Sequence, residues 1–443
     1  MNTPIYDFVK KYVSSQTVRA HMPGHKGRDV THSPFSDAYL YDITEIDGAD
    51  ALFEAHGIIR ESERNASSLY GTAGTVYSTF GSTSCIYAML ACACRPRDTV
   101  IAARNAHRAF INACTLLDLD VTWVYPRFSG TIISGEISLT DVENALRSHD
   151  AAAVYVTSPD YLGKTADIRG ISQICRSHGA YLLCDNAHGA YLAFLHENIH
   201  PTALGADMCC DSAHKTLPVL TGGAYLHSMN AALAARAKEN MSLFCSSSPS
   251  YLIMQSLDLC NGYLAGKFPA DLAEAVDNIS ELKALLSQRY TLCGDEPLKI
   301  SLCTADAGYT GTDTAAYLRE NGIECEYADD THIVLMLSVC NTSEETGYIG
   351  DVLMRLPPRE PLSSSDHSGI TPMEQVMSIR EASLAANEFI PHEELERAAG
   401  RICGRAVTCC PPGIAAAVPG ERITEENVKF LKRYGIPGIN VVK

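Results

Sequence analysis

The sequence predicts an α/β fold in which a mainly parallel sheet with crossover helices is followed by a smaller C-terminal α/β domain. From about residue 74, short apolar or β-branched runs alternate with longer helical stretches, the pattern of parallel strands joined by helices. After Gly223 the stretches become mainly helical, and strand-like runs return near residue 298. A chain of 443 residues also exceeds what one hydrophobic core usually supports, so two domains are expected.

The strands expected in the large sheet are seven short runs: TVYSTF from Thr75, DTVIAA from Asp98, VTWVYP from Val121, AAAVYVTS from Ala151, AYLLCD from Ala180, ADMCCD from Ala206 and GAYLHS from Gly223. The helices expected between them are STSCIYAMLACAC from Ser82, LTDVENALRSH from Leu139 and RGISQICRSHG from Arg169. Thr140 and Glu143 are expected to form a capping box on the second helix, and Gly179 is expected to end the third. The ligand sites of such a sheet lie at the carboxyl ends of its strands.

The rest of the chain divides into three expected parts. Residues 1–40 form an N-terminal segment, residues 41–290 a large domain, and residues 291–443 a C-terminal region with a loop near 355–370, where Pro and Ser are frequent. The later helices are expected in NAALAARAKEN from Asn230, SPSYLIMQSLDLCNGYLAG from Ser248 and DLAEAVDNISELKALLSQRY from Asp271, and strands near LKISLCTA from Leu298 and HIVLMLSV from His332.

Composition excludes some classes of partner. The formal net charge of −17 argues against a nucleic-acid partner and mildly favours a cationic small molecule. The 17 cysteines lie in predicted core segments without CxxC spacing, as expected of small buried side chains in a reducing compartment. The N-terminus lacks an apolar signal region and no run of apolar residues is long enough to span a membrane, so we expect a cytoplasmic protein without membrane contact.

The stretch FGSTS, residues 80–84, is the first candidate ligand site. A strand is expected to end at Phe80, after which a glycine turns the chain and Ser82, Thr83 and Ser84 open a helix. Free backbone N–H groups, hydroxyls and the positive end of the helix dipole suit a phosphate. The same residues are also ordinary helix caps, so this feature alone favours capping.

Two further strand ends carry a carboxylate and an amine. Asp185 follows the apolar run YLLC, where it either pairs with a protonated ring nitrogen of a cofactor or caps the next turn. In DSAHKTLPVLTGGAYLH, Ser212, His214 and Lys215 follow the strand ADMCC. A lysine set among core elements is costly unless it acts as a covalent nucleophile. A phosphate site, a carboxylate and a lysine in this order are the parts that hold pyridoxal phosphate.

The chain resembles the fold type I pyridoxal-phosphate enzymes, and among them the bacterial ornithine, lysine and arginine decarboxylases. The motifs that carry the resemblance are HMPGHKG from His21, DITEIDGADAL from Asp42, FGSTS, RNAHRAF from Arg104, TSPDYLG from Thr157, DNAHGAYL from Asp185, DSAHKTLPVLTGGAYLH and PPGIAAAVPGERI from Pro411. The match is strong over about 20–227, moderate over 371–425 and weak between. It implies a three-layer sheet of the aspartate-aminotransferase type, in the short form that has no N-terminal wing domain.

The resemblance also implies roles for single residues. Lys215 would bind the cofactor as a Schiff base, Asp185 would keep the pyridine nitrogen protonated, and His107 would stack on the ring. The phosphate would be held by Ser82, Thr83, Ser212 and His214, with Ala187 a further cofactor contact, and Lys215 or His214 would protonate the product carbanion. The chain departs from the family pattern at Arg108 and Ala109, at Asp160 and at Asn186.

Candidate substrate residues are less specific. Asp50, Asp160 and Glu421 are carboxylates that could pair with the distal cation of a basic amino acid, although Glu421 could equally be a surface residue opening the next helix. His21 and His25 in HMPGHKG have no neighbouring ligand set, so no metal is expected; the motif would line the active-site entrance, with His25 contributed across a homodimer or larger homo-oligomer as the resemblance implies.

The predicted function is therefore pyridoxal-phosphate-dependent decarboxylation of arginine, lysine or ornithine. An aminotransferase or lyase of the same fold would use the same Lys215 and Asp185, and remains the first alternative. A non-catalytic homologue that binds the cofactor is the second, although the presence of Lys215 disfavours it.

Overall fold

The computed structural model describes residues 1–128, 131–362, 370–409 and 413–443. Residues 363–369 of the predicted loop, and Pro411 and Pro412 of the PPGI motif, lie outside the described residues. The described part is an α/β structure whose element order follows the predicted alternation. No described helix is long and apolar enough to cross a membrane.

The main sheet has seven strands in the order β1-β9-β8-β7-β6-β2-β3. Their bounds are β1 Gly74–Ser78, β2 Thr99–Ala103, β3 Asp120–Val124, β6 Ala151–Thr157, β7 Tyr181–Asp185, β8 Met208–Asp211 and β9 Ala224–Ser228. Strand β2 pairs parallel with β3 and with β6, whereas β9 pairs antiparallel with β1 and with β8. Because β1 and β8 both run against β9, their carboxyl ends lie at the same edge of the sheet. The seven predicted strands are confirmed, with ends shifted by a few residues.

The chain divides into two compact units, which are described separately. The first unit contains residues 1–92, 184–274 and 338–340, and the second contains 93–183, 275–337 and 341–443. Each unit is assembled from segments that alternate along the sequence, so the predicted domain boundaries at 40 and 290 stay a prediction.

Helices cover the sheet strands of the first unit. They are α1 Pro4–Ser14, α2 Ser36–Tyr41, α3 Ile58–Tyr70, α4 Gly81–Ala93, α8 Pro201–Leu204, α9 Ala213–Thr216, α10 Ala231–Ser242 and α11 Tyr251–Leu264, with the 3-10 turn η1 Ala190–Phe194; α12, Phe268–Leu286, follows. Helix α1 is held at its start by Asp258 of α11, whose Oδ2 accepts from the backbone N–H groups of Ile5 and Tyr6 at 2.9 and 3.0 Å. A carboxylate here satisfies donors that the first turn of a helix leaves free.

The helices of the second unit begin and end with recognisable caps. They are α5 Arg108–Leu117, α6 Leu139–Ser148, α7 Ile168–His178, α13 Gly311–Glu320, α14 Ser343–Arg355, α15 Ile379–Leu384 and α16 Glu425–Arg433, with the 3-10 turns η2 Ala305–Ala307 and η3 His392–Ala398. Gly179 ends α7 with φ 71°, as predicted. The predicted cap of α6 was wrong: Ser138 caps it and accepts from the Asp141 N–H, because the helix begins at Leu139 and Thr140 already lies inside it.

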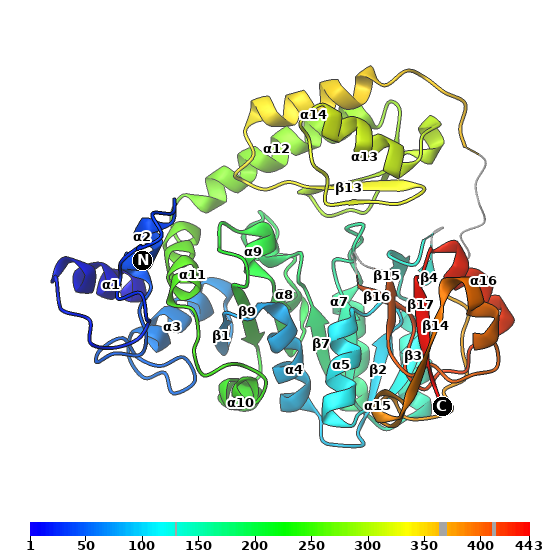
Figure 1. Ribbon diagram of the computed structural model, residues 1–443, viewed down its shortest axis with the longest axis horizontal. Coiled ribbons are helices and arrows are strands. Elements are labelled where there is room, and N and C mark those ends of the chain that lie inside the picture. Colours follow the sequence, from blue (N-terminus) through cyan, green and yellow to red (C-terminus); the bar gives the residue numbers. More distant parts are fainter. Residues whose placement is uncertain (129–130, 363–369, 410–412) are drawn as a thin grey trace. The chain divides into compact units, whose positions relative to one another are not determined.

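The predicted smaller α/β element is a four-stranded sheet in the second unit. Its strands are β10 Thr291–Cys293, β11 Lys299–Cys303, β12 Tyr327–Ala328 and β13 His332–Met336, in the order β10-β11-β13-β12 with antiparallel pairing throughout. Figure 1 shows α13 and α14 over one face of this sheet, near β13. The strands predicted near residues 298 and 332 are confirmed.

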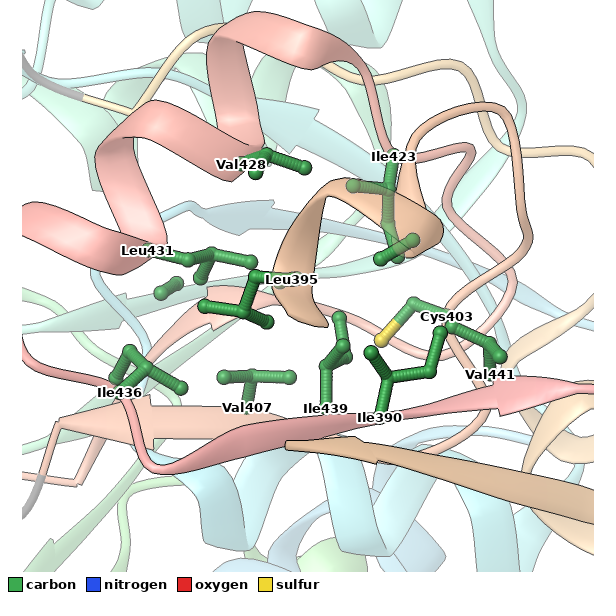
Figure 2. Packing of buried hydrophobic residues seen from close by; sticks show 13 residues of the cluster. Ile390, Leu395, Cys403, Val407, Ile423, Val428, Leu431, Ile436, Ile439 and Val441 are labelled. Atoms are coloured by element: carbon green, nitrogen blue, oxygen red, sulfur yellow. The ribbon is translucent and has the colours of Figure 1, made fainter. Parts of the chain in front are cut away.

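The C-terminal segment of the second unit has its own hydrophobic core. Its short strands are β14 Asn387–Pro391, β15 Val407–Cys409, β16 Ile414–Ala417 and β17 Gly438–Val442, and β4 Arg127–Phe128 pairs with β5 Gly135–Glu136 elsewhere in the unit. Leu395 of η3 and Leu431 of α16 point toward Ile390 and Ile439 on the strands (Figure 2), and these four side chains are at most 1% exposed. Burial of such side chains typically contributes ~2 kcal/mol each.

Candidate active site

The turn after β1 places a hydroxyl pair at the start of α4. Gly81 has φ +73°, a conformation that glycine adopts without strain, and its N–H donates to the Gly222 carbonyl at 2.8 Å. The Ser212 hydroxyl donates to the Ser82 Oγ at 2.8 Å, so the residues that follow β1 and β8 meet at one edge of the sheet. Thr83 is exposed beside them, whereas the Ser84 hydroxyl donates to the Gly81 carbonyl at 3.0 Å within the first turn of α4. This bond of Ser84 does not cap a free N–H group, and the phosphate interpretation of FGSTS stays a prediction.

Asp185 ends β7 and is 3% exposed. Its Oδ1 accepts from the Ala187 N–H at 3.2 Å and from the Cys210 thiol at 3.6 Å. The turn-capping alternative is therefore present in the structure, through the bond from the Ala187 N–H to Asp185 Oδ1. Ala187 reaches Asp185 through its backbone N–H, which fixes the orientation of the carboxylate.

Lys215 lies in α9 with an exposed side chain, and its Nζ is 3.0 Å from the Nε2 of His188. His188 is 7% exposed and lies in the turn after β7. An exposed amine bears no large desolvation cost, so a covalent role for Lys215 rests on its position and its partner rather than on burial. The amine, Asp185 and the two serines all belong to the first unit.

His214 precedes Lys215 and holds its ring through the backbone. Its Nδ1 donates to the Gly223 carbonyl at 2.9 Å. Burial lowers the pKa of His214, although the bond to Gly223 opposes this and the neighbouring Lys215 reinforces it. A neutral ring in this tautomer has only an acceptor left at Nε2, so His214 can donate to a phosphate only after gaining a proton.

A fully buried hydrogen-bonded group surrounds Asp211, the last residue of β8. Asp211 Oδ2 accepts from His200 Nε2 at 3.0 Å and His227 Nε2 at 3.1 Å, and Oδ1 accepts from Asn186 Nδ2 at 2.7 Å. All four residues are 0% exposed. Burial alone would raise the pKa of Asp211, but the two imidazoles hold it well below its usual range.

The same group contains the spacing of a metal site, because ligand atoms of His200, Cys209 and Asp211 lie within 4.8 Å of one another. The Thr202 backbone N–H donates to His200 Nδ1 at 3.3 Å, so a neutral His200 carries its proton on Nε2. A protonated Nε2 donates to Asp211 and offers no lone pair to a metal. The group is therefore best described as a hydrogen-bonded network.

In the second unit, His107 caps α5 and lies against the segment that follows the PPGI prolines. Its Nδ1 accepts from the Ala109 N–H at 3.2 Å, and the Arg108 N–H donates to the Gly413 carbonyl at 2.9 Å. Gly413 has φ +76°, and a Cβ there would lie 2.8 Å from His107 Nε2. Only glycine permits the chain to pass this close to the imidazole.

Glu421 forms an ion pair with Arg104, three residues before His107. Arg104 Nη2 lies 3.1 and 3.3 Å from the two Glu421 carboxylate oxygens, and Nη1 donates to the Ala415 carbonyl at 2.6 Å. The side chains are 1% and 0% exposed. The alternative that Glu421 is a surface residue opening a helix was wrong, because the residue is buried and α16 begins only at Glu425.

Asp50 and Asp160 organise backbone turns. Asp160 is 4% exposed and accepts from the N–H groups of Leu162, Lys164 and Gly135. The two carboxylate oxygens of Asp50 accept from four backbone N–H groups, those of Ala51, His56, Gly57 and Ile59, ahead of α3. Burial raises the pKa of Asp160; at Asp50 the burial effect is overcome by these N–H groups, which lower the pKa.

The HMPGHKG segment is held by local contacts in the first unit. His25 Nε2 is 3.1 Å from Asp42 Oδ2, and its Nδ1 accepts from the Gly27 N–H. The Tyr12 hydroxyl is 2.6 Å from His21 Nε2. The two histidines thus have separate partners.

Sequence reasoning missed three residues of this region: His188, Asp211 and Arg104. His188 lies inside the DNAHG motif and Arg104 opens RNAHRAF, so position within a motif was the available signal. Asp211 ends an apolar strand, as Asp185 does, so the same signal marked both residues.

The first unit supplies groups that fit pyridoxal phosphate. An amine, a buried carboxylate and two hydroxyls at a helix start lie at the carboxyl ends of β8, β7 and β1. The buried hydroxyls of Thr79 and Thr216, beside these ends, have no hydrogen-bond partner among the described residues. Buried polar atoms of this kind normally find a partner, and a phosphate would provide acceptors.

Comparison with solved structures defines the class. A lysine decarboxylase of Francisella novicida matches with TM-score 0.84 and 17% identity, over 100% of this chain and 81% of that chain. An alanine–glyoxylate aminotransferase of Nostoc matches with TM-score 0.56 and 17% identity, over 67% of this chain and 85% of that chain. The chain has the fold of the type I pyridoxal-phosphate enzymes, as predicted.

The family models narrow the class. The model described as the major domain of Orn/Lys/Arg decarboxylase matches residues 3–294, and that of its C-terminal domain matches residues 367–434. The chain belongs to the Orn/Lys/Arg decarboxylase family and is a pyridoxal-phosphate-dependent amino-acid decarboxylase. Among similar proteins, the uncharacterized protein YaaO of Bacillus subtilis is 31% identical over 98% of this chain and 94% of its own length. An arginine decarboxylase of Halalkalibacterium halodurans is 29% identical over the same shares.

Proposed function

We propose that the chain decarboxylates a basic amino acid, with arginine ahead of lysine and ornithine. The observation that carries the proposal is the meeting of Lys215, Asp185 and the Ser82–Ser212 pair at neighbouring strand ends of one unit. The preference for arginine is supported by relatives named arginine decarboxylase, which are 28–29% identical over nearly the whole chain.

Each residue has a stated task in this proposal. Bound pyridoxal phosphate supplies a protonated ring that accepts the electrons left when carbon dioxide departs. Lys215 provides the amine that binds the cofactor, and Asp185 keeps the pyridine nitrogen of the cofactor protonated. Ser82, Thr83, Ser212 and a protonated His214 bind the phosphate, and His107 packs on the ring. Ala187 orients Asp185 through its N–H.

A proton must finally reach the substrate carbon. The Lys215 ammonium carries protons at Nζ and is exposed, so it can serve as the general acid. His214 at Nε2 is the second candidate for this step.

The distal cation of the substrate needs a different partner from those first expected. The carboxylates of Asp50 and Asp160 are occupied by backbone N–H groups, and Glu421 is paired with Arg104. We therefore assign the cation to the partly exposed Asp42, which opens DITEIDGADAL and lies beside His25 of HMPGHKG.

Residues 18–35, which include HMPGHKG, are the proposed contact of a homodimer. Val18, Met22, Val30 and Phe35 are 89%, 62%, 81% and 67% exposed within twenty residues of one another. Apolar side chains gathered on one segment are typical of interfaces. We further propose a cytoplasmic location, which suits the many buried thiols, such as Cys85 and Cys403, whose pKa burial raises.

Rates with arginine, lysine, ornithine and norleucine, measured as carbon dioxide and amine release, test the proposal. We expect the three cationic amino acids to react and norleucine to remain inert. The Lys215→Ala variant should lose the visible absorbance of the lysine-bound cofactor. The Asp185→Asn variant should retain the cofactor, with turnover lower by roughly 10³-fold. Turnover that required an added keto acid would instead identify an aminotransferase. Cofactor bound without any turnover would identify a non-catalytic homologue.

A further inference from the structure

We propose that His188 is the proton partner of the Lys215 amine, and that Asp211 holds His188 in place through Asn186. The inference rests on the proposed function, because it concerns the amine that binds the cofactor.

The contact between the two side chains is short and specific. Lys215 Nζ and His188 Nε2 are 3.0 Å apart, and His188 is 7% exposed. An ammonium has donors and no acceptor, so the Nε2 lone pair receives the bond when the lysine is charged. A proton that lies between two bases can be transferred without a large movement of either side chain.

The turn that carries His188 is fixed to the strand end that precedes Lys215. The Asn186 N–H donates to the Cys210 carbonyl at 3.0 Å, and the Gly189 N–H closes the turn on the Asn186 carbonyl at 2.8 Å. The Asn186 amide donates to Asp211 Oδ1 at 2.7 Å. Asp211 therefore fixes both the turn that bears His188 and the start of the segment that bears Lys215.

Asp211 is suited to this positioning because its other acceptors are already used. His200 and His227 occupy Oδ2, and no part of the group is exposed to solvent. A buried carboxylate that is paired on both oxygens has little freedom to change its orientation.

His188 then performs a balanced proton exchange. It would take one proton from the Lys215 ammonium, which would free the Nζ lone pair to bond to the aldehyde carbon of pyridoxal phosphate. It returns this proton to the carbonyl oxygen, which leaves as water together with a second proton from Nζ. One proton stays on the nitrogen, and His188 ends neutral, as it began.

The test is the rate at which cofactor-free protein binds pyridoxal phosphate covalently, followed by visible absorbance between pH 6 and 9. Borohydride reduction and peptide mapping identify the modified lysine. In His188→Gln, which keeps an acceptor but cannot take a proton in this range, we expect attachment about 100-fold slower. The pH profile should also lose the inflection that the imidazole provides. His196→Gln, an exposed histidine of the same unit, is the matched control and should behave as the wild type.

A second variant separates positioning from proton transfer. Asn186→Ala removes the link to Asp211 and leaves His188 in the chain. We expect attachment about tenfold slower with the inflection retained. Thermal unfolding of each cofactor-free variant measures any loss of folding independently.

The outcomes distinguish this inference from the proposed function. If Lys215→Ala still acquires the absorbance band and another lysine is labelled, the proposed function fails. If Lys215 is labelled but His188→Gln attaches the cofactor at the wild-type rate with an unchanged pH profile, only the role of His188 is overturned.

Discussion

The histidine–aspartate pair His227–Asp211 in the first unit and the pair His332–Asp329 in the second have pKa shifts of opposite direction at the histidine. In the first unit, His227 lies 3.1 Å from Asp211 and neither side chain is exposed. In the second, His332 lies 3.8 Å from Asp329, with the side chains 8% and 22% exposed. Burial lowers the pKa of His227 despite the attraction of Asp211. Burial also acts on His332, but Asp329 and Cys293 together raise its pKa to about 9.

The difference shows that a nearby carboxylate does not by itself make a histidine cationic. Asp211 divides its charge among His200, His227 and Asn186 in a site without solvent. Asp329 faces one imidazole, that of His332, and also accepts from the Tyr327 hydroxyl at 2.9 Å and from the Thr331 and His332 backbone N–H groups at 2.8 and 2.7 Å. The second imidazole at Asp211 and the remaining access of water at His332 and Asp329 account for the difference between the two histidines.

The largest effect is expected from Asp211→Asn, which removes the acceptor that the first pair depends on. The asparagine amide places an NH₂ group where a carboxylate oxygen accepted hydrogen bonds, so buried donors such as His200 Nε2 and His227 Nε2 lose their acceptor. We expect the free energy of unfolding to fall by about 4 kcal/mol. Urea unfolding measures it, with the exposed Asp277→Asn as the control. A loss below about 1 kcal/mol would show that the network contributes little.

The second pair should be sensitive to alkaline pH. The folded pKa of His332 lies above its unfolded value, so its contribution is complete below about pH 6.5 and disappears as the pH rises through about 9. Wild type should exceed His332→Gln by about 3 kcal/mol at pH 6 and by little at pH 10. Denaturant unfolding of both proteins over this range checks the difference. An equal gap at both pH values would contradict the assignment.

The first pair should respond to acid instead. Because the folded pKa of His227 is lowered, the unfolded chain binds the proton first, and stability falls as the pH drops below 6.5. In His227→Gln the slope of stability against pH between 6.5 and 5 should be shallower than in the wild type. An unchanged slope would mean that other groups, such as His214, account for the acid sensitivity.

The smallest effect is expected at Asp258, a buried carboxylate without a histidine partner. Burial raises its pKa to about 6 although Ser62 and the N–H groups of Tyr6 and Ile5 oppose this. The stability linked to this group is present below pH 3.8 and lost as the pH rises through about 6.

Asp258→Asn keeps an acceptor for the two N–H groups and removes the buried charge. Its stability should therefore remain within about 1 kcal/mol of the wild type at pH 8. Thermal melts at pH 5 and 8 provide the test. A large loss at pH 8 would show that the charge itself holds α1.

The fold could be predicted from local pattern, and the site only in part. Apolar runs such as YLLC and ADMCC predicted the order of the strands. The rule that ligand sites lie at the carboxyl ends of parallel strands predicted that Asp185, Ser82 and Lys215 lie at one edge of the sheet. The cap of α6 was misplaced because Ser138 and Thr140 are equally suitable in sequence, and only the start of the helix separates them.

The candidate substrate carboxylates could not be judged from the sequence. Asp160 and Asp50 accept hydrogen bonds from backbone N–H groups, and residue types in the sequence do not indicate such contacts. Glu421 forms its ion pair with an arginine 317 positions away. Contacts at such a separation depend on the folded topology. The roles of Lys215, Asp185 and His107 themselves stay predictions until they are tested.

The separation of Arg104 and Glu421 also sets a delay during synthesis. At roughly 5–20 residues per second, a ribosome needs about 15 to 60 s to add the 317 residues between them. Throughout this time the guanidinium that will be 1% exposed has no carboxylate, and the Ala415 carbonyl that it binds does not yet exist. The buried environment of the Arg104 guanidinium can therefore be completed only after nearly the whole chain has been synthesised.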